Sequence, residues 1–128
     1  MKAYIIALII ALIVITAIFL FFALNPLRHS ATSIENRLYR ITPLGTSYET
    51  ATNKLSKVFG NISFSDKTGF MRQDALAPPE LVGTKSIHVY LGNYYQIPIG
   101  TTAVGAYWGF DNTDKLIEIW VRKDTDSL

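Results

Sequence analysis

Side chains that could support acid–base or metal chemistry are few and far apart in this sequence. The two histidines are His29 and His88, and no cysteine is present. This separation gives neither the H-x-H nor the H-x-x-x-H spacing of a zinc site, and the lack of cysteine excludes disulfides, thiolate ligands and cysteine nucleophiles. The sequence also has no nucleophile elbow, P-loop or dinucleotide fingerprint. We therefore expect no metal site and no cofactor.

His88 nevertheless keeps an enzymatic hypothesis open. It is expected on a strand face shared with Glu118, where the two side chains could form the acid–base couple of a small hydrolase. The simpler interpretation, a half-exposed strand histidine beside tyrosines, is preferred. Residues 111–114 lack the further oxygen ligands, the glycine and the glutamate of a calcium loop. Their aspartates and Asn112 are interpreted as turn residues.

A set of aromatic and cationic side chains is the better candidate for a functional site. Strand alternation places several of them on the second face of a sheet, with two tyrosines on a following Tyr/Pro-rich segment, residues 93–100. Tyr, Trp and Arg are enriched at protein–protein hot spots because they bury a large area and keep a polar group. The predicted partner-binding residues are His88, Tyr90, Tyr94, Tyr95, Tyr107, Trp120 and Arg122. The alternative is that residues 61–80 or the juxtamembrane segment fold across this face as a second small core.

The N-terminal segment determines where this domain is displayed. Residues 3–24 contain no charged side chain and a single polar one, Thr16. A helix of this length is about 33 Å long, close to the roughly 30 Å hydrocarbon core of a bilayer. A secretory signal is the alternative, but its apolar region is shorter, and residues 22–28 offer no good cleavage site. We expect an uncleaved transmembrane anchor that contacts the lipid bilayer through residues 3–24.

The charged residues on the two sides of this anchor do not predict a single orientation. Lys2 precedes it, whereas Arg28, Arg37 and Arg40 follow it, and a literal count places the domain in the cytoplasm. A short basic tail before a long apolar stretch instead resembles a bacterial signal anchor, whose downstream domain is exported. We expect the bacterial inner membrane, with a periplasmic C-terminal domain. Beyond the anchor the charges nearly balance, 11 basic against 10 acidic once Lys2 is removed from the 12 basic residues, so no nucleic-acid partner is expected.

The anchor also carries a weak signal for self-association. Ala3, Ala7 and Ala11 have the small-xxx-small spacing that lets two membrane helices approach closely. A weak homodimer through these alanines is therefore an option.

The soluble part is predicted to begin with an amphipathic helix at 47–59. Thr46 is expected as its N-cap, with Glu49 three residues later in a capping-box pattern, and apolar side chains then follow one helical stripe. Gly60 is expected to end the helix in a left-handed conformation. A brief juxtamembrane helix is also indicated within residues 33–41.

Alternating apolar and polar residues predict an antiparallel sheet of three or more strands, the last two joined by the turn at 111–114. This turn pairs Trp108 with Ile117 and Gly105 with Trp120, and it builds one continuous apolar face. The predicted fold class is α+β: an N-terminal transmembrane helix, then a small domain with an amphipathic helix packed on an antiparallel β-meander.

The predicted organisation has four parts along the chain. They are an anchor at 1–24, a juxtamembrane linker or short helix at 25–40, the soluble domain at 41–123 and a C-terminal tail at 124–128.

Two short motifs resemble a family of envelope proteins. Residues 41–51, Ile-Thr-Pro-Leu-Gly-Thr-Ser-Tyr-Glu-Thr-Ala, lead through a helix to Phe59-Gly60, and residues 107–120 form an aromatic hairpin containing Phe-Asp-Asn. Over about residues 41–123 this arrangement resembles the outer-membrane assembly lipoprotein BamE (SmpA/OmlA) and β-lactamase-inhibitor-protein-like domains. The resemblance implies an envelope-facing, protein-binding domain without catalysis. The chain departs from the lipoproteins because it has no lipidated cysteine, and it has Asp114 where a turn glycine is common.

The sequence thus favours a membrane-anchored, non-enzymatic interaction domain that acts as an envelope assembly or scaffold factor. One alternative is a tethered inhibitor or immunity protein that blocks a toxin or hydrolase. The other is the small hydrolase that would use His88.

Overall fold

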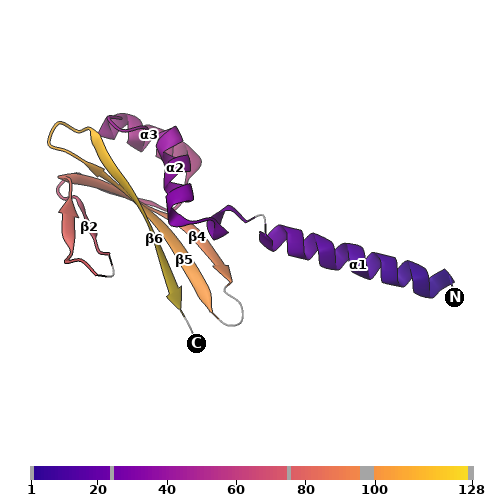
Figure 1. Ribbon diagram of the computed structural model, residues 1–128. Helices are drawn as coiled ribbons and strands as arrows, with labels where there is room; N and C mark the ends of the chain where they lie inside the picture. The colour runs from indigo at the N-terminus through magenta and orange to yellow at the C-terminus, as the bar shows by residue number, and fades with distance from the viewer. Residues whose placement is uncertain (1, 24, 75, 96–99, 127–128) are drawn as a thin grey trace.

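The computed structural model describes residues 2–23, 25–74, 76–95 and 100–126. Helix α1, Lys2–Ala23, projects away from a small folded domain (Figure 1). Within residues 2–20 no part of this helix is buried. Its length and apolar composition are compatible with membrane insertion, and a signal sequence near an N-terminus meets the same description.

A folded segment, not a free linker, follows α1. The 3₁₀ turn η1, Pro26–Arg28, is capped by Asn25, and helix α2, Ala31–Ile41, is capped by Ser30. In each case the side-chain oxygen of the cap accepts a backbone N–H. The short helix expected in this region is confirmed, and α2 lies against the last strand of the sheet.

Helix α3, Tyr48–Val58, is the amphipathic helix that the sequence predicted, but with a different cap. Ser47, not Thr46, is the N-cap, and its hydroxyl oxygen accepts the N–H of Thr50 at 3.1 Å. The Thr46 hydroxyl instead donates to the carbonyl oxygen of Pro43 at 2.6 Å. Thr46 therefore closes the preceding turn, and the helix starts one residue later.

The end of α3 also differs from the prediction. Phe59 is the C-cap in an extended conformation, with φ −118° and ψ 141°. Gly60 is not among the described residues with positive φ. The chain leaves the helix directly toward a strand, so the expected left-handed glycine is wrong.

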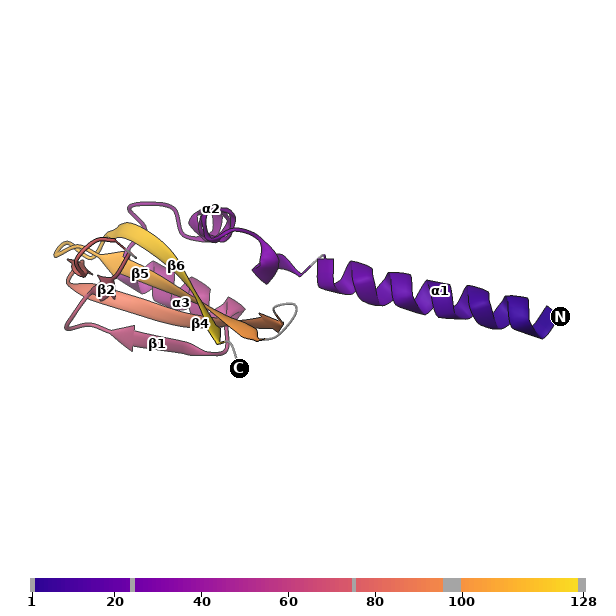
Figure 2. The same cartoon turned by 60° about the horizontal axis from the view of Figure 1, so that its bottom comes forward.

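Two antiparallel sheets follow the helices. The main sheet has the order β1-β4-β5-β6, with β1 at one edge (Figure 2). Its strands are β1 (Ile62–Ser65), β4 (Lys85–Tyr95), β5 (Thr101–Phe110) and β6 (Leu116–Asp126), and the separate hairpin pairs β2 (Phe70–Arg72) with β3 (Glu80–Val82). Helices α2 and α3 pack on one face of the main sheet, and the β2–β3 hairpin packs on the other (Figure 1). The domain is therefore α+β, as predicted.

The pairing of β5 with β6 differs by two residues from the predicted register. Trp108 pairs with Ile119, not Ile117, and Gly105 pairs with Arg122, not Trp120. A shift of two residues keeps every side chain on its own face. The predicted apolar face is therefore correct for Trp108, Ile119 and Val121, although its cross-strand partners and the placement of Ile117 are not.

Two shifts of one residue each add up to this difference. The turn is one residue longer than predicted, because the Asp111 N–H donates to the carbonyl oxygen of Lys115 at 2.9 Å, and a β-bulge lies next to the turn. Gly109 pairs with Glu118, whereas Phe110 pairs with Leu116, so Ile117 is the extra residue on β6. Ile117 is 44% exposed, contrary to its expected place on the buried face. An insertion of this kind bends the strand and leaves one residue without a partner.

The β5–β6 turn itself is built from the residues that were interpreted as turn formers. Asp114 has φ 64°, the left-handed conformation for which glycine is common. Asp111 Oδ1 accepts the N–H groups of Thr113 and Lys115 at 2.9 and 3.0 Å. Hydrogen bonds, first of all from the Thr113 hydroxyl, lower the pKa of Asp111 below its ordinary value of 3.8.

Strand β6 runs beyond the predicted end of the domain at residue 123. It pairs with β5 as far as Asp126, which lies opposite Thr101. Most of the expected tail, residues 124–128, is thus strand, and residues 127–128 lie outside the described residues.

The main core lies between the helices and the sheet. The strand side chains that are fully buried there are Ile87, Val89, Val104, Ala106, Trp108 and Phe110, and those of α3 are Ala51 and Leu55. Burial of this apolar surface supplies the main force that holds both helices on the sheet.

Helix α2 also covers the outer edge of β6. The Tyr39 hydroxyl oxygen accepts the N–H of Ile119 at 2.8 Å. Glu35 Oε1 accepts the N–H of Val121 at 3.0 Å. Two backbone donors at the edge of the sheet are therefore satisfied by helix side chains.

Candidate protein-binding surface

The sheet face opposite the helices carries a row of aromatic rings. His88 on β4 is paired with Tyr107 on β5, which is paired with Trp120 on β6. The ring centroids of His88 and Tyr107 are 4.3 Å apart, and those of Tyr107 and Trp120 are 5.4 Å apart. These three predicted residues therefore do share one face, which we call the aromatic face.

The β2–β3 hairpin covers one end of the aromatic face. Phe70 stacks on Trp120, with centroids 6.0 Å apart and an interplanar angle of 10°, and lies 5.5 Å from Tyr107. Val82 completes this second small core, in which Trp120 is only 7% exposed. The self-covering alternative is thus correct for Trp120, and its assignment as a partner-binding residue is wrong.

Gly109 allows the hairpin to approach the sheet closely. A Cβ atom at this position would lie 2.8 Å from Val82 Cγ1 and 2.9 Å from Phe70 Cε1. Both separations are below van der Waals contact, so any larger residue would push the hairpin outward. This glycine was expected only as a strand residue, and its packing role was not predicted.

An ion pair joins the hairpin to the main sheet. Arg72 on β2 binds Glu118 on β6 and also lies 3.4 Å from Asp74. Because these side chains are partly exposed, the pair orients the hairpin more than it stabilises the fold. Neither Arg72 nor this use of Glu118 was anticipated from the sequence.

His88 does not form the acid–base couple considered above. In the part of the chain that the structure describes, no hydrogen bond or ion pair joins it to Glu118, which is engaged by Arg72. Its ring lies against the backbone at Gly105, with Nε2 3.1 Å from where a Cβ would be. Burial lowers the pKa of His88 below its ordinary value of 6.5, which favours the neutral ring.

Tyr94 and Tyr95 lie on strand β4, not on a loop, and they do not extend the aromatic face together. A register shift before Gly92, whose φ is 135°, inserts a bulge. Tyr94 is consequently on the helix side of the sheet, where its hydroxyl is 3.4 Å from Lys123 Nζ, and its predicted place on a loop is wrong. Tyr95 is 68% exposed. Residues 96–99 of the predicted binding segment lie outside the described residues.

The outer side of the β2–β3 hairpin is an exposed apolar surface that the sequence interpretation missed. Met71 and Leu81 are cross-strand partners, and they are 53% and 57% exposed. Leu76, in the connection between the strands, is fully exposed. Three-residue strands are too short for alternation to be recognised. The sequence signal that could have indicated the hairpin is a pair of adjacent apolar residues on each strand, Phe70-Met71 and Leu81-Val82. In each pair one side chain packs on the main sheet and the other faces outward.

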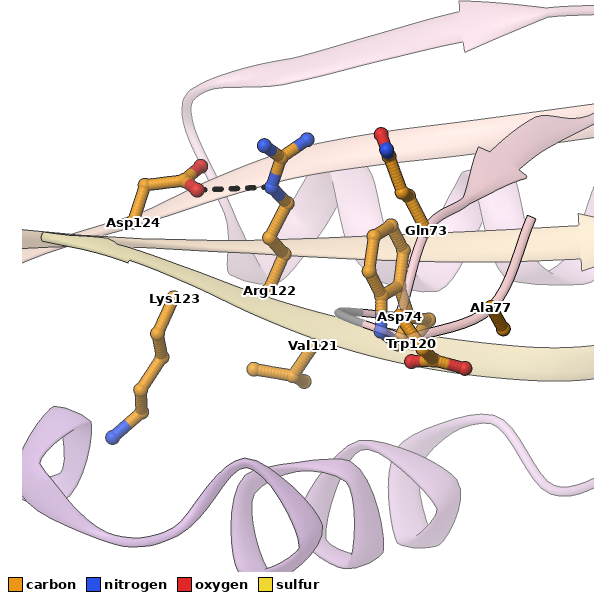
Figure 3. Close-up of a pocket in the computed structure, with 8 residues that line it drawn as sticks. All are labelled: Gln73, Asp74, Ala77, Trp120, Val121, Arg122, Lys123 and Asp124. Carbon is orange, nitrogen blue, oxygen red and sulfur yellow. Dashed lines mark hydrogen bonds and ion pairs between the residues drawn. The ribbon is translucent and has the colours of Figure 1, made fainter. Parts of the chain in front are cut away.

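An open cavity of about 540 Å³ separates β6 from the β2–β3 connection (Figure 3). Figure 3 shows Arg122 on the same side of the strand as Trp120, whereas Val121 and Lys123 point toward the helices. Arg122 Nε binds Asp124 Oδ1 at 3.0 Å. The lining residues are Gln73, Asp74, Ala77 and 120–124. This mostly polar hollow lacks the apolar lining that small-molecule sites use.

Neither metal ligands nor relatives identify an activity. Among the described residues there is no group of three or more His, Cys, Asp or Glu side chains that could hold a metal ion. Comparison with known proteins gives no match to a family model, a curated protein or a solved structure.

Proposed function

We propose that the protein is a single-pass membrane protein whose domain binds another protein in the bacterial periplasm, without catalysis. The binding surface comprises the outer side of the β2–β3 hairpin and the uncovered part of the aromatic face. Its residues are Met71, Leu81, His88, Tyr90, Tyr107 and Arg122. The observation that carries the proposal is the exposed pair of Met71 and Leu81.

A two-stranded hairpin on a protein surface ordinarily presents polar side chains to water. Here the inner side is apolar because Phe70 and Val82 pack on the sheet, and the outer side is apolar as well. Exposed apolar patches with polar rims mark interaction sites, and methionine adapts its shape to a partner. Tyr90 is 41% exposed on the neighbouring strand and supplies an aromatic group of the kind found at hot spots.

The anchor part of the proposal is supported by α1. The helix is apolar all round, and residues 2–20 bury nothing in the domain, so lipid is the environment that suits it. A role at the envelope is supported by the resemblance to BamE-type domains. The order on which that resemblance rests, a helix followed by an antiparallel meander, is the order found for α3 and the main sheet.

Photo-crosslinking from single cysteines tests the binding surface, because the chain has no cysteine of its own. Leu81 and Val58 make a matched pair, since both are 57% exposed and they lie on opposite sides of the domain. The full chain carrying Leu81→Cys or Val58→Cys is labelled with a photoreactive maleimide in cells whose outer membrane is permeabilised. We expect a discrete adduct from position 81 that is absent from position 58.

Charge substitution provides the second arm of the same experiment. Leu81→Asp should lower recovery of that partner by at least about tenfold, the effect of losing one hot-spot contact, whereas Val58→Asp should leave recovery unchanged. Equal recovery from both variants would contradict the proposed surface. The partner's identity then separates the two roles, since an assembly component indicates a scaffold and a toxin or hydrolase indicates an inhibitor.

A further inference from the structure

The segment that follows α1, residues 27–29, is hydrogen-bonded to one end of the main sheet. Lys123 Nζ, on β6, donates to the carbonyl oxygens of Leu27 and His29 at 3.0 and 2.5 Å. Arg28 Nη2 donates to the carbonyl oxygen of Tyr95, on β4, at 2.8 Å. Two strands thus hold the segment that leaves α1, and we call these contacts the clasp.

Ring contacts and packing add to the clasp. The guanidinium of Arg28 and the ammonium of Lys123 each lie 5.1 Å from the centre of the Tyr94 ring, within the range of cation–π attraction. Leu27 packs on the main core and comes close to the backbone at Gly92, where a Cβ would be 3.0 Å from Leu27 Cδ1. The junction is therefore part of the folded domain.

Chain length limits how far the clasp can be from the end of α1. Ala23 is the last residue of α1, and Leu27 is already held by Lys123. Four Cα–Cα steps of about 3.8 Å allow at most roughly 15 Å between them. Figures 1 and 2 agree that the ends of β4 and β6 lie on the side of the domain toward α1, while the β5–β6 turn lies on the far side.

We propose that this end of the sheet, with the exposed Tyr95 and the half-buried Arg28, rests in the headgroup layer of a phospholipid bilayer. The inference depends on the proposed membrane anchor. Tyr and Arg side chains favour this layer because they combine an apolar body with a polar or charged tip. The domain is consequently held at the membrane in one orientation, with the β5–β6 turn directed away from lipid.

The charges at this end are compatible with the contact. Arg122 lies on the same stretch of β6 and is exposed, and Asp124 is its ion-pair partner. Because Asp124 is paired, it adds little repulsion toward lipid phosphates, and the second acidic residue at this end, Asp126, is outnumbered by Arg28, Arg122 and Lys123. The contact follows from the short connection to α1, so it does not require anionic lipid.

Fluorescence quenching in reconstituted vesicles tests the contact with the full chain. An environment-sensitive dye is placed at Tyr95→Cys, at Thr113→Cys in the far turn, or at Ile10→Cys in α1. The vesicles contain phosphatidylcholine with or without phosphatidylglycerol, plus lipids spin-labelled on the headgroup or on the acyl chain. Headgroup labels should quench position 95 at least about twofold more than position 113, because the headgroup layer is only roughly 5–8 Å deep on each side.

The dye at position 10 separates failure of the anchor from failure of the contact. Strong acyl-chain quenching at 10 with equal quenching at 95 and 113 overturns the membrane contact alone. No quenching at 10 overturns the anchor together with the contact.

Lys123→Ala should reduce quenching at 95 toward the value at 113 while circular dichroism stays native, and Lys57→Ala is the control. Quenching at 95 that is unchanged by Lys123→Ala rules out the clasp as its cause.

Discussion

The indole N–H of Trp108 donates a 2.9 Å hydrogen bond to the hydroxyl of Thr42. Both side chains are completely buried. The Thr42 hydroxyl in turn donates to the carbonyl oxygen of Leu38 at 3.2 Å. This chain of hydrogen bonds joins the C-terminal part of β5 to the last turn of α2.

Thr42→Val should therefore destabilise the domain. It keeps the volume nearly constant but leaves the indole N–H of Trp108 without an acceptor, which costs about 1–3 kcal/mol in a buried site. Thr42→Ser keeps the hydroxyl and should recover that loss apart from one methyl group. Urea unfolding followed by circular dichroism measures both variants. A Thr42→Val midpoint above that of Thr42→Ser would show that the hydrogen bond contributes nothing.

Gly109→Ala should loosen the β2–β3 hairpin and leave the main core in place. The new methyl group would overlap Phe70 and Val82, and such overpacking costs typically about 1–3 kcal/mol. Displacing Phe70 exposes Trp120, so the tryptophan emission should shift to longer wavelength and become more accessible to acrylamide. Trp120→Phe in the same background should abolish the shift, because Trp108 stays buried.

Gly60→Ala is the matched control for this effect. A Cβ at position 60 meets nothing within 4 Å, and its φ is not left-handed. This variant should therefore leave the emission spectrum and stability unchanged, or raise stability slightly by restricting the unfolded chain. An equal red shift from both glycine variants would count against packing as the cause.

His88 should make the stability of the domain depend on pH. Burial lowers the pKa of His88 in the folded state below 6.5, so between these two pKa values the unfolded chain binds more protons than the folded one. The stability contribution is fully present above about pH 6.5 and is lost as the pH falls through the folded-state pKa. Thermal melts at about pH 7.5 and about pH 5 should differ less for His88→Phe than for the wild type. An unchanged difference would assign the pH dependence to other groups.

The sequence was sufficient to predict the longer regular elements, because each has a strong local pattern, whereas the three-residue strands β2 and β3 were not predicted. Apolar spacing indicated α2 and α3, and alternation indicated the long strands of the main sheet. The β5–β6 register was missed because the turn with its left-handed Asp114 is one residue longer than predicted and the bulge at Ile117 adds another residue. Neither feature has a recognisable sequence pattern. The helix cap moved from Thr46 to Ser47 because both residue types cap well and only the path of the preceding turn decides between them.

The candidate site was predicted in part for the same reason. Strand parity placed His88, Tyr107 and Trp120 on one face, and this is a local property. Covering of Trp120 by Phe70 depends on a contact between segments about 50 residues apart, which alternation cannot reveal. Tyr94 was predicted on a loop, whereas β4 continues to Tyr95, and the inserted residue before Gly92 turns Tyr94 to the helix side of the sheet.

Satisfaction of the β6 edge by α2 limits association of the domain with other copies of itself. An open strand edge is a template on which sheets join into filaments. Glu35 and Tyr39 already occupy the backbone N–H groups of Val121 and Ile119. A strand from another copy therefore finds these two donors of the β6 edge already bonded, which hinders polymerisation through this edge.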